Sequence, residues 1–419
     1  MQTVRDAVME CPGCGALQTL AEIEPPVQLS CGRCGATLRQ ARRRSVLFCA
    51  TAAATGLALF GLAFLFPTAR VWMRGGRLAV SYLVTGPESL RGAGAWELAL
   101  AVSVTLFAWP LFKFVSVLAM AVSVSLGRTP RPLKAAFAFV TQNAEWAMID
   151  VFLLGALIAL FRLQAWMRVT YGPALFALGG AALCSLAIDA ALDRAAFWRS
   201  VALAERPRES AADASDIGCE SCGLVSRALD GERCPRCERA LHTRKRASVG
   251  RTWALTLTAA LLAIPANVLP VLTITKLGRG GPSTILGGTF ELARAGIWGL
   301  AVVVFVASVL VPVVKVAGLS LLLVSTARRS SAHLPLRTRA YRLIALIGRW
   351  SMVDIFATMT LVAIARFGWL GNVMPEPGAI AFCGVVVLTM LASDAFDPRL
   401  MWDAAGMNAR QAALGSRSS

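Results

Sequence analysis

The sequence is poor in the residues on which many enzymes and nucleotide-binding proteins depend. Its 419 residues include only two histidines, His242 and His333, which nearly excludes histidine-centred catalysis and a His-rich metal site. No glycine is followed directly by lysine, so a Walker A loop is absent and we do not expect the chain to hydrolyse ATP itself. Charged residues make up 16% of the chain, well below the ~25% of soluble proteins, which excludes an ordinary soluble protein.

Long apolar runs take the place of the missing charge. Hydrophobic residues make up 56% of the chain, and the runs recur with regular spacing. Each is about 20 residues or longer, which is enough for a helix to cross a bilayer. We therefore predict an all-α polytopic membrane protein with eight transmembrane helices. The predicted spans lie near residues 46–66, 97–126, 143–162, 173–196, 252–274, 296–326, 343–366 and 377–396.

The basic residues predict the orientation of the chain. The formal net charge of +18 comes from 42 Lys and Arg against 24 Asp and Glu. With eight spans, most Arg-rich connections fall on one side, which the positive-inside rule assigns to the cytosol together with both termini. This surface fits contact with anionic headgroups better than nucleic-acid binding, so we expect no nucleic-acid partner. Arg70, Arg74, Arg77 and Arg91 on the opposite side depart from the rule. The cytosolic clusters lie within residues 42–44, 128–134, 194–208, 244–251 and 328–342.

The two halves of the chain repeat each other in the same order. Each half holds an even number of spans, so the repeats are expected to be parallel and related by an axis along the membrane normal. The matched segments are 11–15 with 219–223, 96–99 with 290–293, 110–113 with 312–315, 145–152 with 349–356, and 189–198 with 394–402. The expected organisation is a ribbon at 1–42, a four-helix repeat at 43–200, a second ribbon at 201–247, a second repeat at 248–403, and a disordered cytosolic tail at 404–419.

Two cysteine modules carry the most specific motif. Two Cys-x2-Cys pairs at this separation present four thiolates tetrahedrally, which suits a structural zinc ribbon. The same four sulfurs could hold a rubredoxin-like iron, and sequence alone does not separate the two metals. Disulfides are disfavoured because the flanking arginines place both modules in the reducing cytosol. The predicted ligands are Cys11, Cys14, Cys31 and Cys34 in the first module, and Cys219, Cys222, Cys234 and Cys237 in the second.

Charged residues inside the predicted spans form the second candidate site. A charge at the centre of a span costs roughly 2.5–3.5 kcal/mol, so such residues are expected to face the bundle interior and to pair. Lys113 and Lys315 each lie three residues after a proline that should kink its helix. The kink should expose a carbonyl near Leu106 in one half or Ser308 in the other.

Four carboxylates occupy matching places in the two halves, and we expect them to converge with both lysines on the cytosolic half of the bundle. They are either structural ion pairs or the lining of a polar cavity that binds a lipid headgroup or relays a proton. The second half adds Asn267, inside the span-interrupting segment 265–270, where a buried amide needs a partner. The polar candidates are Lys113, Asp150, Asp189, Asn267, Lys315, Arg349, Asp354 and Asp394.

The whole chain resembles the paraquat-inducible protein A (PqiA/LetA) family. The resemblance is carried by the order of ribbon plus four spans, twice over, and by Asn267-Val-Leu-Pro270, Pro312-x-x-Lys315, Arg349-Trp-Ser-Met-Val-Asp354 and Ala392-Ser-Asp394. It implies a multi-pass subunit of the bacterial inner membrane that works with a periplasmic MCE-domain tunnel protein. In that role the chain would load or receive phospholipid as a transporter subunit and not as an enzyme.

Two other functions remain open at this stage. Iron in the ribbons would make the chain a membrane redox protein, although the paired histidines that an intramembrane haem requires are missing. Alternatively, the spans would only anchor the periplasmic partner, and the ribbons would dock a cytosolic protein. Lipid contact inside the bundle distinguishes a transporter from such a scaffold.

Overall fold

The computed structural model describes residues 8–19, 27–41, 45–72, 78–164, 168–199, 201, 215–276, 279–364 and 371–407. Several predicted features lie outside these residues. They are the arginines at 42–44, Arg74, Arg77, the basic residues at 202–208, and positions 408–419 of the expected tail.

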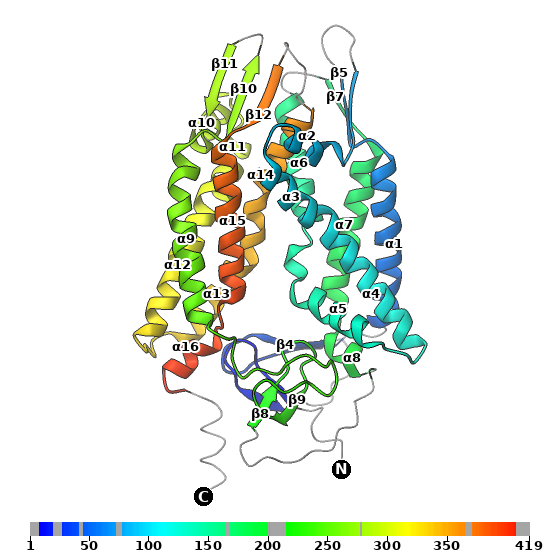
Figure 1. Ribbon diagram of the computed structural model, residues 1–419, viewed down its shortest axis with the longest axis vertical. Helices are drawn as coiled ribbons and strands as arrows, with labels where there is room; N and C mark the ends of the chain where they lie inside the picture. The colour runs from blue at the N-terminus through cyan, green and yellow to red at the C-terminus, as the bar shows by residue number, and fades with distance from the viewer. Residues whose placement is uncertain are drawn as a thin grey trace, which may run out of the picture.

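Within the described residues, eight helices are long and apolar enough to cross a membrane, which confirms the predicted fold class. Four belong to each half of the chain, and the halves form two bundles side by side (Figure 1). α1 carries no charged residue, while α7 and α15 each begin with a proline, which is favoured in a first helical turn.

The first half has this element order: α1 (Ser45–Leu65), β5 (Ala69–Trp72), β6 (Leu78–Ser81), α2 (Thr85–Gly92), α3 (Trp96–Ser103), η1 (Val104–Ala108), α4 (Trp109–Ser125), α5 (Arg131–Gln142), η2 (Ala144–Trp146), α6 (Ile149–Gln164), β7 (Arg168–Tyr171), α7 (Pro173–Ala191) and α8 (Arg194–Arg199).

The second half repeats that order: α9 (Ser248–Val268), β10 (Leu272–Lys276), β11 (Arg279–Ser283), α10 (Ile285–Arg294), α11 (Trp298–Phe305), η3 (Val306–Leu310), α12 (Val311–Ala327), α13 (Leu334–Gly348), η4 (Arg349–Met352), α14 (Val353–Ile364), β12 (Gly371–Pro375), α15 (Pro377–Ala395) and α16 (Arg399–Ala404).

Several details of the predicted spans and repeat differ from the structure. The fourth span ends at Ala191 and not at 196. The fifth span ends at Val268 and not at 274, because Leu269 takes the extended conformation favoured before Pro270 and β10 follows. Segment 265–270 therefore ends a span and does not interrupt it. The seventh span begins at Leu334, nine residues earlier than predicted. The match of 96–99 with 290–293 is also wrong, since Trp96 begins α3 whereas 290–293 lies in α10 and Trp298 begins the equivalent α11.

Both long spans contain a π-helical turn directly before their proline. η1 precedes Pro110, and η3 precedes Pro312. A proline donates no backbone hydrogen bond, and a π-bulge absorbs that loss within the helix. The turns include Leu106 and Ser308, the positions where a disturbed backbone is predicted.

The two halves meet along α6 and α14. Each of these helices follows a short 3₁₀ segment, η2 or η4, that breaks the third span of its half. Phe152 and Phe356 pack edge to face across the contact, with ring centroids 5.6 Å apart. Gly155 permits the close approach, because a β-carbon there would lie 2.6 Å from the carbonyl oxygen of Val353.

A small antiparallel sheet lies at one end of each bundle, which we call the far side (Figure 1). The strand orders are β6-β5-β7 in the first half and β11-β10-β12 in the second. In each sheet the third strand comes from the connection between the third and fourth spans, so the sheet ties distant parts of one half together.

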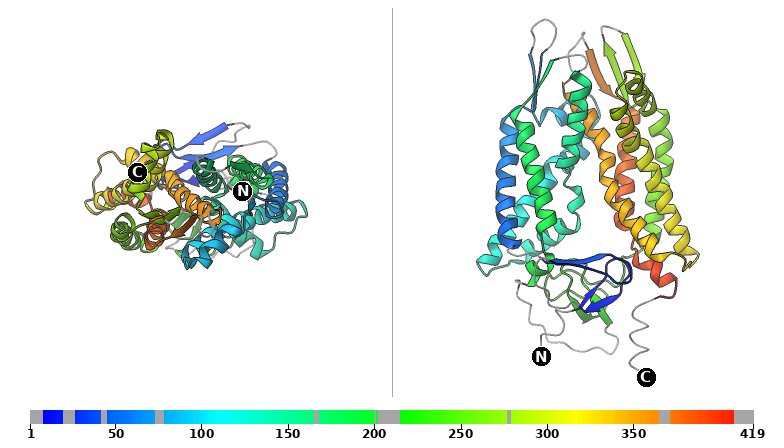
Figure 2. Two further views of the ribbon diagram at one scale, coloured as in Figure 1. Left: turned by 90° about the horizontal axis from the view of Figure 1, so that it is seen from above. Right: turned by 180° about the vertical axis from the view of Figure 1, so that it is seen from behind.

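The cysteine modules lie together at the opposite end, the ribbon side (Figure 2). The first ribbon, residues 8–41, consists of the hairpins β1 (Val8–Glu10) with β2 (Leu17–Thr19) and β3 (Val27–Ser30) with β4 (Thr37–Ala41). The second ribbon, residues 215–242, has the hairpin β8 (Ser215–Gly218) with β9 (Val225–Ala228) and an isolated bridge between Arg233 and Ala240.

The ribbons dock crosswise onto the two halves. Arg342 of α13 donates hydrogen bonds to Cys34 O at 3.1 Å and Gly35 O at 3.0 Å in the first ribbon. Gln142 of α5 donates to Ser221 of the second ribbon at 2.9 Å. Each ribbon thus contacts the half that does not follow it in the chain, in addition to its own half, and these crossing contacts join the halves at the ribbon side.

Candidate functional site

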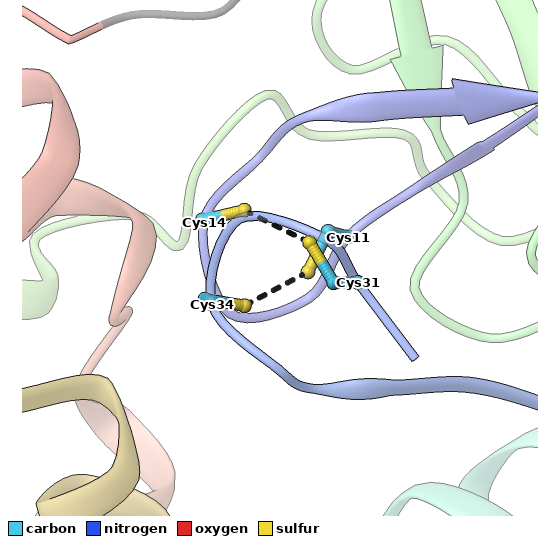
Figure 3. A group of neighbouring side chains, drawn as sticks. All are labelled: Cys11, Cys14, Cys31 and Cys34. Atoms are coloured by element: carbon cyan, nitrogen blue, oxygen red, sulfur yellow. Dashed lines mark hydrogen bonds between the residues drawn. The ribbon is translucent and has the colours of Figure 1, made fainter. Parts of the chain in front are cut away.

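Each ribbon brings its four predicted cysteine ligands together, and Figure 3 shows the four of the first ribbon. Cys11 Sγ and Cys34 Sγ lie 3.5 Å apart, and Cys14 Sγ and Cys31 Sγ lie 3.6 Å apart. These separations are far longer than the ~2.05 Å of a disulfide bond, and the cysteines are free. In the second ribbon the corresponding pairs lie 3.4 Å and 3.5 Å apart.

The sulfur geometry fits a tetrahedral metal ion. Metal–sulfur bonds of about 2.3 Å would place the sulfurs about 3.8 Å apart, close to the observed separations. Without a cation, four thiols this close cannot all ionise. Contact with Cys219 raises the pKa of Cys222 and lowers that of Cys234. A bound cation would favour the thiolate form of all four, so each cluster can hold a metal ion.

A buried ion network fastens both ribbons to the end of the last span. Arg399 pairs with Asp397 at 2.9 Å, with Glu10 of the first ribbon at 3.4 Å, and with Glu220 of the second. Glu10 also accepts a hydrogen bond from Gly218 N at 2.9 Å, and it pairs with Arg244 at 3.3 Å. Burial opposes ionisation of Asp397, but Arg399 more than offsets this effect and holds the pKa of Asp397 below its ordinary value.

Lys113 of the first half is fully paired. Its ammonium is 2% exposed and donates to Ser185 Oγ at 2.8 Å, to Ser185 O at 3.4 Å and to an Asp189 carboxylate oxygen at 2.8 Å. Ser185 and Asp189 are four residues apart on α7, so both side chains point to one face of the helix. This lysine therefore forms an ion pair that joins α4 to α7.

Lys315 of the second half is buried without such a partner. It is 1% exposed, and its ammonium has no hydrogen-bond partner among the described residues. Asp394 and Glu145 act on it electrostatically, but neither forms a hydrogen bond with it. The difference arises from spacing at the end of the fourth span of each half. Asp189 is four residues before Asp193, whereas Asp394 is only three residues before the equivalent Asp397. The position equivalent to Asp189 is therefore occupied by Ser393, which has no carboxylate to pair with Lys315.

Two buried hydroxyls near Lys315 also lack partners among the described residues. They are Ser308 in η3, two helical turns before Lys315, and Ser351 in η4, which contacts η3. Counting from the prolines, Ser308 corresponds to Leu106, and counting along the 3₁₀ segments, Ser351 corresponds to Ala147. The second half thus places hydroxyls where the first half has apolar side chains.

Two cross-half contacts bring further predicted residues together. Arg349 pairs with Asp150 at 3.3 Å, and Trp146 Nε1 donates to Asp394 Oδ2 at 3.4 Å. The symmetric counterpart of the first pair would set Glu145 against Asp354, and two carboxylates would repel each other. Glu145 lies instead near the carboxylate of Asp394, where Arg349 and Lys315 are also close enough to act on Glu145 electrostatically.

Two predicted members lie away from this cluster. Asn267 is exposed at the far-side end of α9, where its amide donates to Ala263 O at 2.8 Å. Its expected buried position is wrong because α9 ends one residue later. Asp354 lines a small cavity with Val271 and Phe382 between the halves, so it is not part of the ribbon-side cluster around Lys315.

Sequence reasoning missed Ser308, Ser351, Glu145 and Arg194 as members of the polar site. For the two serines and Glu145 the signal is present in the aligned repeats, as differences between copies: serine against leucine or alanine, and glutamate against arginine. Arg194 has Arg399 in the matched segment, so no such difference marks it. Residues shared by the two halves stand out when the halves are aligned, whereas positions at which the halves differ do not.

Comparison with known proteins agrees with the repeated architecture. Residues 48–202 and 249–406 each match the profile of the family described as Paraquat-inducible protein A. The chain is 31% identical over 412 residues to Intermembrane transport protein PqiA of Escherichia coli (strain K12), covering 94% of this chain and 95% of that protein. It is 30% identical over 409 residues to Lipophilic envelope-spanning tunnel protein A of the same organism, covering 96% and 92%. No solved structure matches the chain.

Proposed function

Because the chain belongs to the paraquat-inducible protein A family, we propose that it is the inner-membrane subunit of a phospholipid transport system. Two relatives named as an intermembrane transport protein and an envelope-spanning tunnel protein support this proposal. The chain loads phospholipid into, or receives it from, a periplasmic MCE-domain tunnel protein. It acts as a transporter subunit and not as an enzyme.

The observation that carries the proposal is the unpaired polar group in the second half. A buried ammonium and two buried hydroxyls that find no partner among the described residues are costly in an apolar bundle unless a ligand binds them. A lipid phosphate supplies several acceptor oxygens, and the apolar helices around it suit acyl chains. The first half lacks this chemistry, because Lys113 is neutralised and the hydroxyls are replaced by Leu106 and Ala147. We therefore propose that the second half handles the headgroup.

The remaining polar candidates are proposed to couple the halves. Arg349 and Asp150 join them directly, Asp189 holds Lys113, and Asp394 lies between Trp146 and Lys315. We propose that proton uptake and release by these carboxylates and Lys315 drives the cycle without ATP. Asn267 and Asp354, nearer the far side, are proposed to act where lipid is exchanged with the partner.

Zinc is the proposed metal of both ribbons, with a structural role. Four sulfur ligands leave no coordination position for water or substrate. The metal would therefore cross-link the two Cys-x2-Cys pairs of each ribbon and would not take part in catalysis. The proposed orientation has the ribbons and both termini in the cytosol of a bacterial cell, where zinc–thiolate sites are stable.

Photo-crosslinking of lipid tests the proposal. A photoreactive amino acid replaces Ser351 in the full-length chain, in cells whose phospholipids carry ³²P. We expect a labelled lipid adduct, which Lys315→Gln reduces at least several-fold because the phosphate loses its cation. The matched control replaces Ala147, the equivalent residue of the first half, and should give little adduct. Equal labelling at both positions would contradict a headgroup site in the second half.

Function in cells provides a second test. Lys315→Gln should abolish the contribution of the protein to the membrane barrier against detergent, while the variant still inserts and retains its metal. Metal analysis of the same preparation separates the alternatives, since colourless zinc protein excludes electron transfer through rubredoxin-like iron. A membrane anchor without transport would tolerate the substitution.

A further inference from the structure

A cavity of about 640 Å³ lies between the two ribbons and the ribbon-side ends of the helices. The first ribbon contributes Glu10 and Arg39, and the second contributes Glu220 and Ser221. The opposite wall includes Asp394 of the second half. We call this space the ribbon cavity.

A second cavity of about 210 Å³ reaches into the first half, and we call it the inner cavity. Lys113 and Asp189 line it together with Glu145 and Arg349. Leu192 and Arg194 line both cavities, so the two spaces meet at these residues. The ribbon cavity therefore borders Asp394 of the second half, and the inner cavity borders the ion pair of the first half.

Both spaces are suited to water. A polar cavity holds a water molecule once it offers ~10–15 Å³, and both volumes exceed that by more than tenfold. Their walls carry charged side chains, which remain hydrated unless they are paired. By contrast, the far-side cavity beside Asp354 measures about 10 Å³, which leaves room for one water at most.

Arg194 marks the junction of the two cavities. Its side chain is exposed to them, yet it forms no ion pair with any described residue. The neighbouring Asp193 forms an ion pair with Arg39 at 3.3 Å, and Asp189 forms an ion pair with Lys113 at 2.8 Å. Asp189 also acts on Arg194 electrostatically, but one carboxylate between two cations leaves the junction with an excess of positive charge.

We infer that the two ribbons cover a water-filled vestibule through which water and small hydrophilic ions reach the charged residues of both halves from the ribbon side. The vestibule consists of the ribbon cavity and the inner cavity, with Arg194 and Leu192 at its neck. The ribbons thus have a role beyond anchoring, since they form part of the wall of this hydrated approach. This inference holds whether or not the chain carries phospholipid.

Cysteine accessibility tests the vestibule in the full-length protein. Cys49, Cys184 and Cys383 are first replaced by alanine, and ribbon thiols stay protected by their metal. Leu192→Cys probes the neck, and Ile188→Cys, 1% exposed, probes the inner cavity. The reagents are membrane-impermeant methanethiosulfonates, one anionic and one cationic, applied to either face of sealed vesicles. The parent without an added cysteine gives the background.

We expect both cysteines to react from the ribbon side and not from the far side. Ala53→Cys is the matched control, since Ala53 is 0% exposed on α1 and lines neither cavity. The anionic reagent should modify Leu192→Cys about threefold faster than the cationic one, because Arg194 raises the local anion concentration. Arg194→Gln should remove this preference. Labelling no faster than Ala53→Cys, or labelling from the far side alone, would overturn the inference.

A blocking variant keeps the test decisive if a cysteine variant folds poorly. Leu192→Trp fills the neck and should slow modification of Ile188→Cys at least several-fold, while gel filtration confirms that the protein stays folded. An unchanged rate of Ile188→Cys modification would show that the reagent does not pass Leu192. The proposed connection between the two cavities would then be wrong.

Discussion

Replacing the two buried lysines by methionine should change stability in opposite directions. Lys315→Met removes a buried ammonium that has no hydrogen-bond partner among the described residues. Desolvation of such a group costs about 1–3 kcal/mol, and the methionine retains most of the apolar stem. This variant should therefore be more stable by roughly that amount. Lys113→Met breaks three hydrogen bonds and leaves Asp189 unpaired.

The cost of Lys113→Met is limited by solvent. Asp189 is 37% exposed, so water takes over part of the lost pairing, and we expect a loss of about 1–2 kcal/mol. The two variants should then differ by about 3 kcal/mol, although both remove one charge from an equivalent position. This difference is large enough to measure in a membrane protein.

Unfolding in mixed micelles provides the assay. The full-length protein in mild detergent is titrated with sodium dodecyl sulfate, and unfolding is followed by tryptophan fluorescence. Val313→Met serves as the control, because Val313 lies on the exposed face of the same helix as Lys315 and should change stability little. A loss of stability for Lys315→Met equal to that of Lys113→Met would show that Lys315 is paired after all. The reasoning about the second half would then fail.

Three further predictions follow from packing, pH and metal. Gly155→Ala should destabilise the contact of the halves by about 1–3 kcal/mol, because its β-carbon meets backbone of α14, whereas Gly61→Ala, with open space around it, should be neutral or stabilising in the same unfolding assay. The lowered pKa of Asp397 means that its pair with Arg399 stabilises the native state above the unfolded pKa of about 4, and that this stability is lost as pH falls through the folded pKa. Proteolysis of the ribbons should therefore rise as pH is lowered, and Asp397→Asn should show this sensitivity already at pH 7; identical pH profiles would contradict the assignment. Cys14→Ser should lower the bound metal from two ions to one by elemental analysis, and unchanged metal would show that the first cluster does not bind.

The fold was predictable from sequence where the physical signal is local. Apolar runs of bilayer length identify the spans, and paired Cys-x2-Cys motifs identify the ribbons, because neither signal depends on distant contacts. The far-side sheets were missed, since β5 to β7 and β10 to β12 are strands of four or five residues whose pairing joins connections far apart in sequence. Short strands of this kind carry too few residues for a clear alternation.

The polar site was predictable in composition but not in pairing. Lys113, Asp189, Arg349 and Asp150 do form ion pairs, but the pairing of Arg349 with the opposite half depends on how the halves meet. Sequence symmetry suggested that both lysines behave alike. The lysines differ because Asp394 on the last span is shifted by one residue relative to Asp189 in the first half. The effect of this shift can be judged only when it is known which face of the helix points to the lysine.

Joining two copies in one chain has a consequence for how such a protein can evolve. In a homodimer of a single unit, every substitution occurs twice, so both lysines would always meet identical neighbours. A tandem chain allows one copy to keep its salt bridge and hold the assembly together, while the other gives up its counter-ion and becomes free to receive cargo. The contacts of each ribbon with the opposite half hold the two unequal copies together, so one copy can specialise without weakening its association with the other.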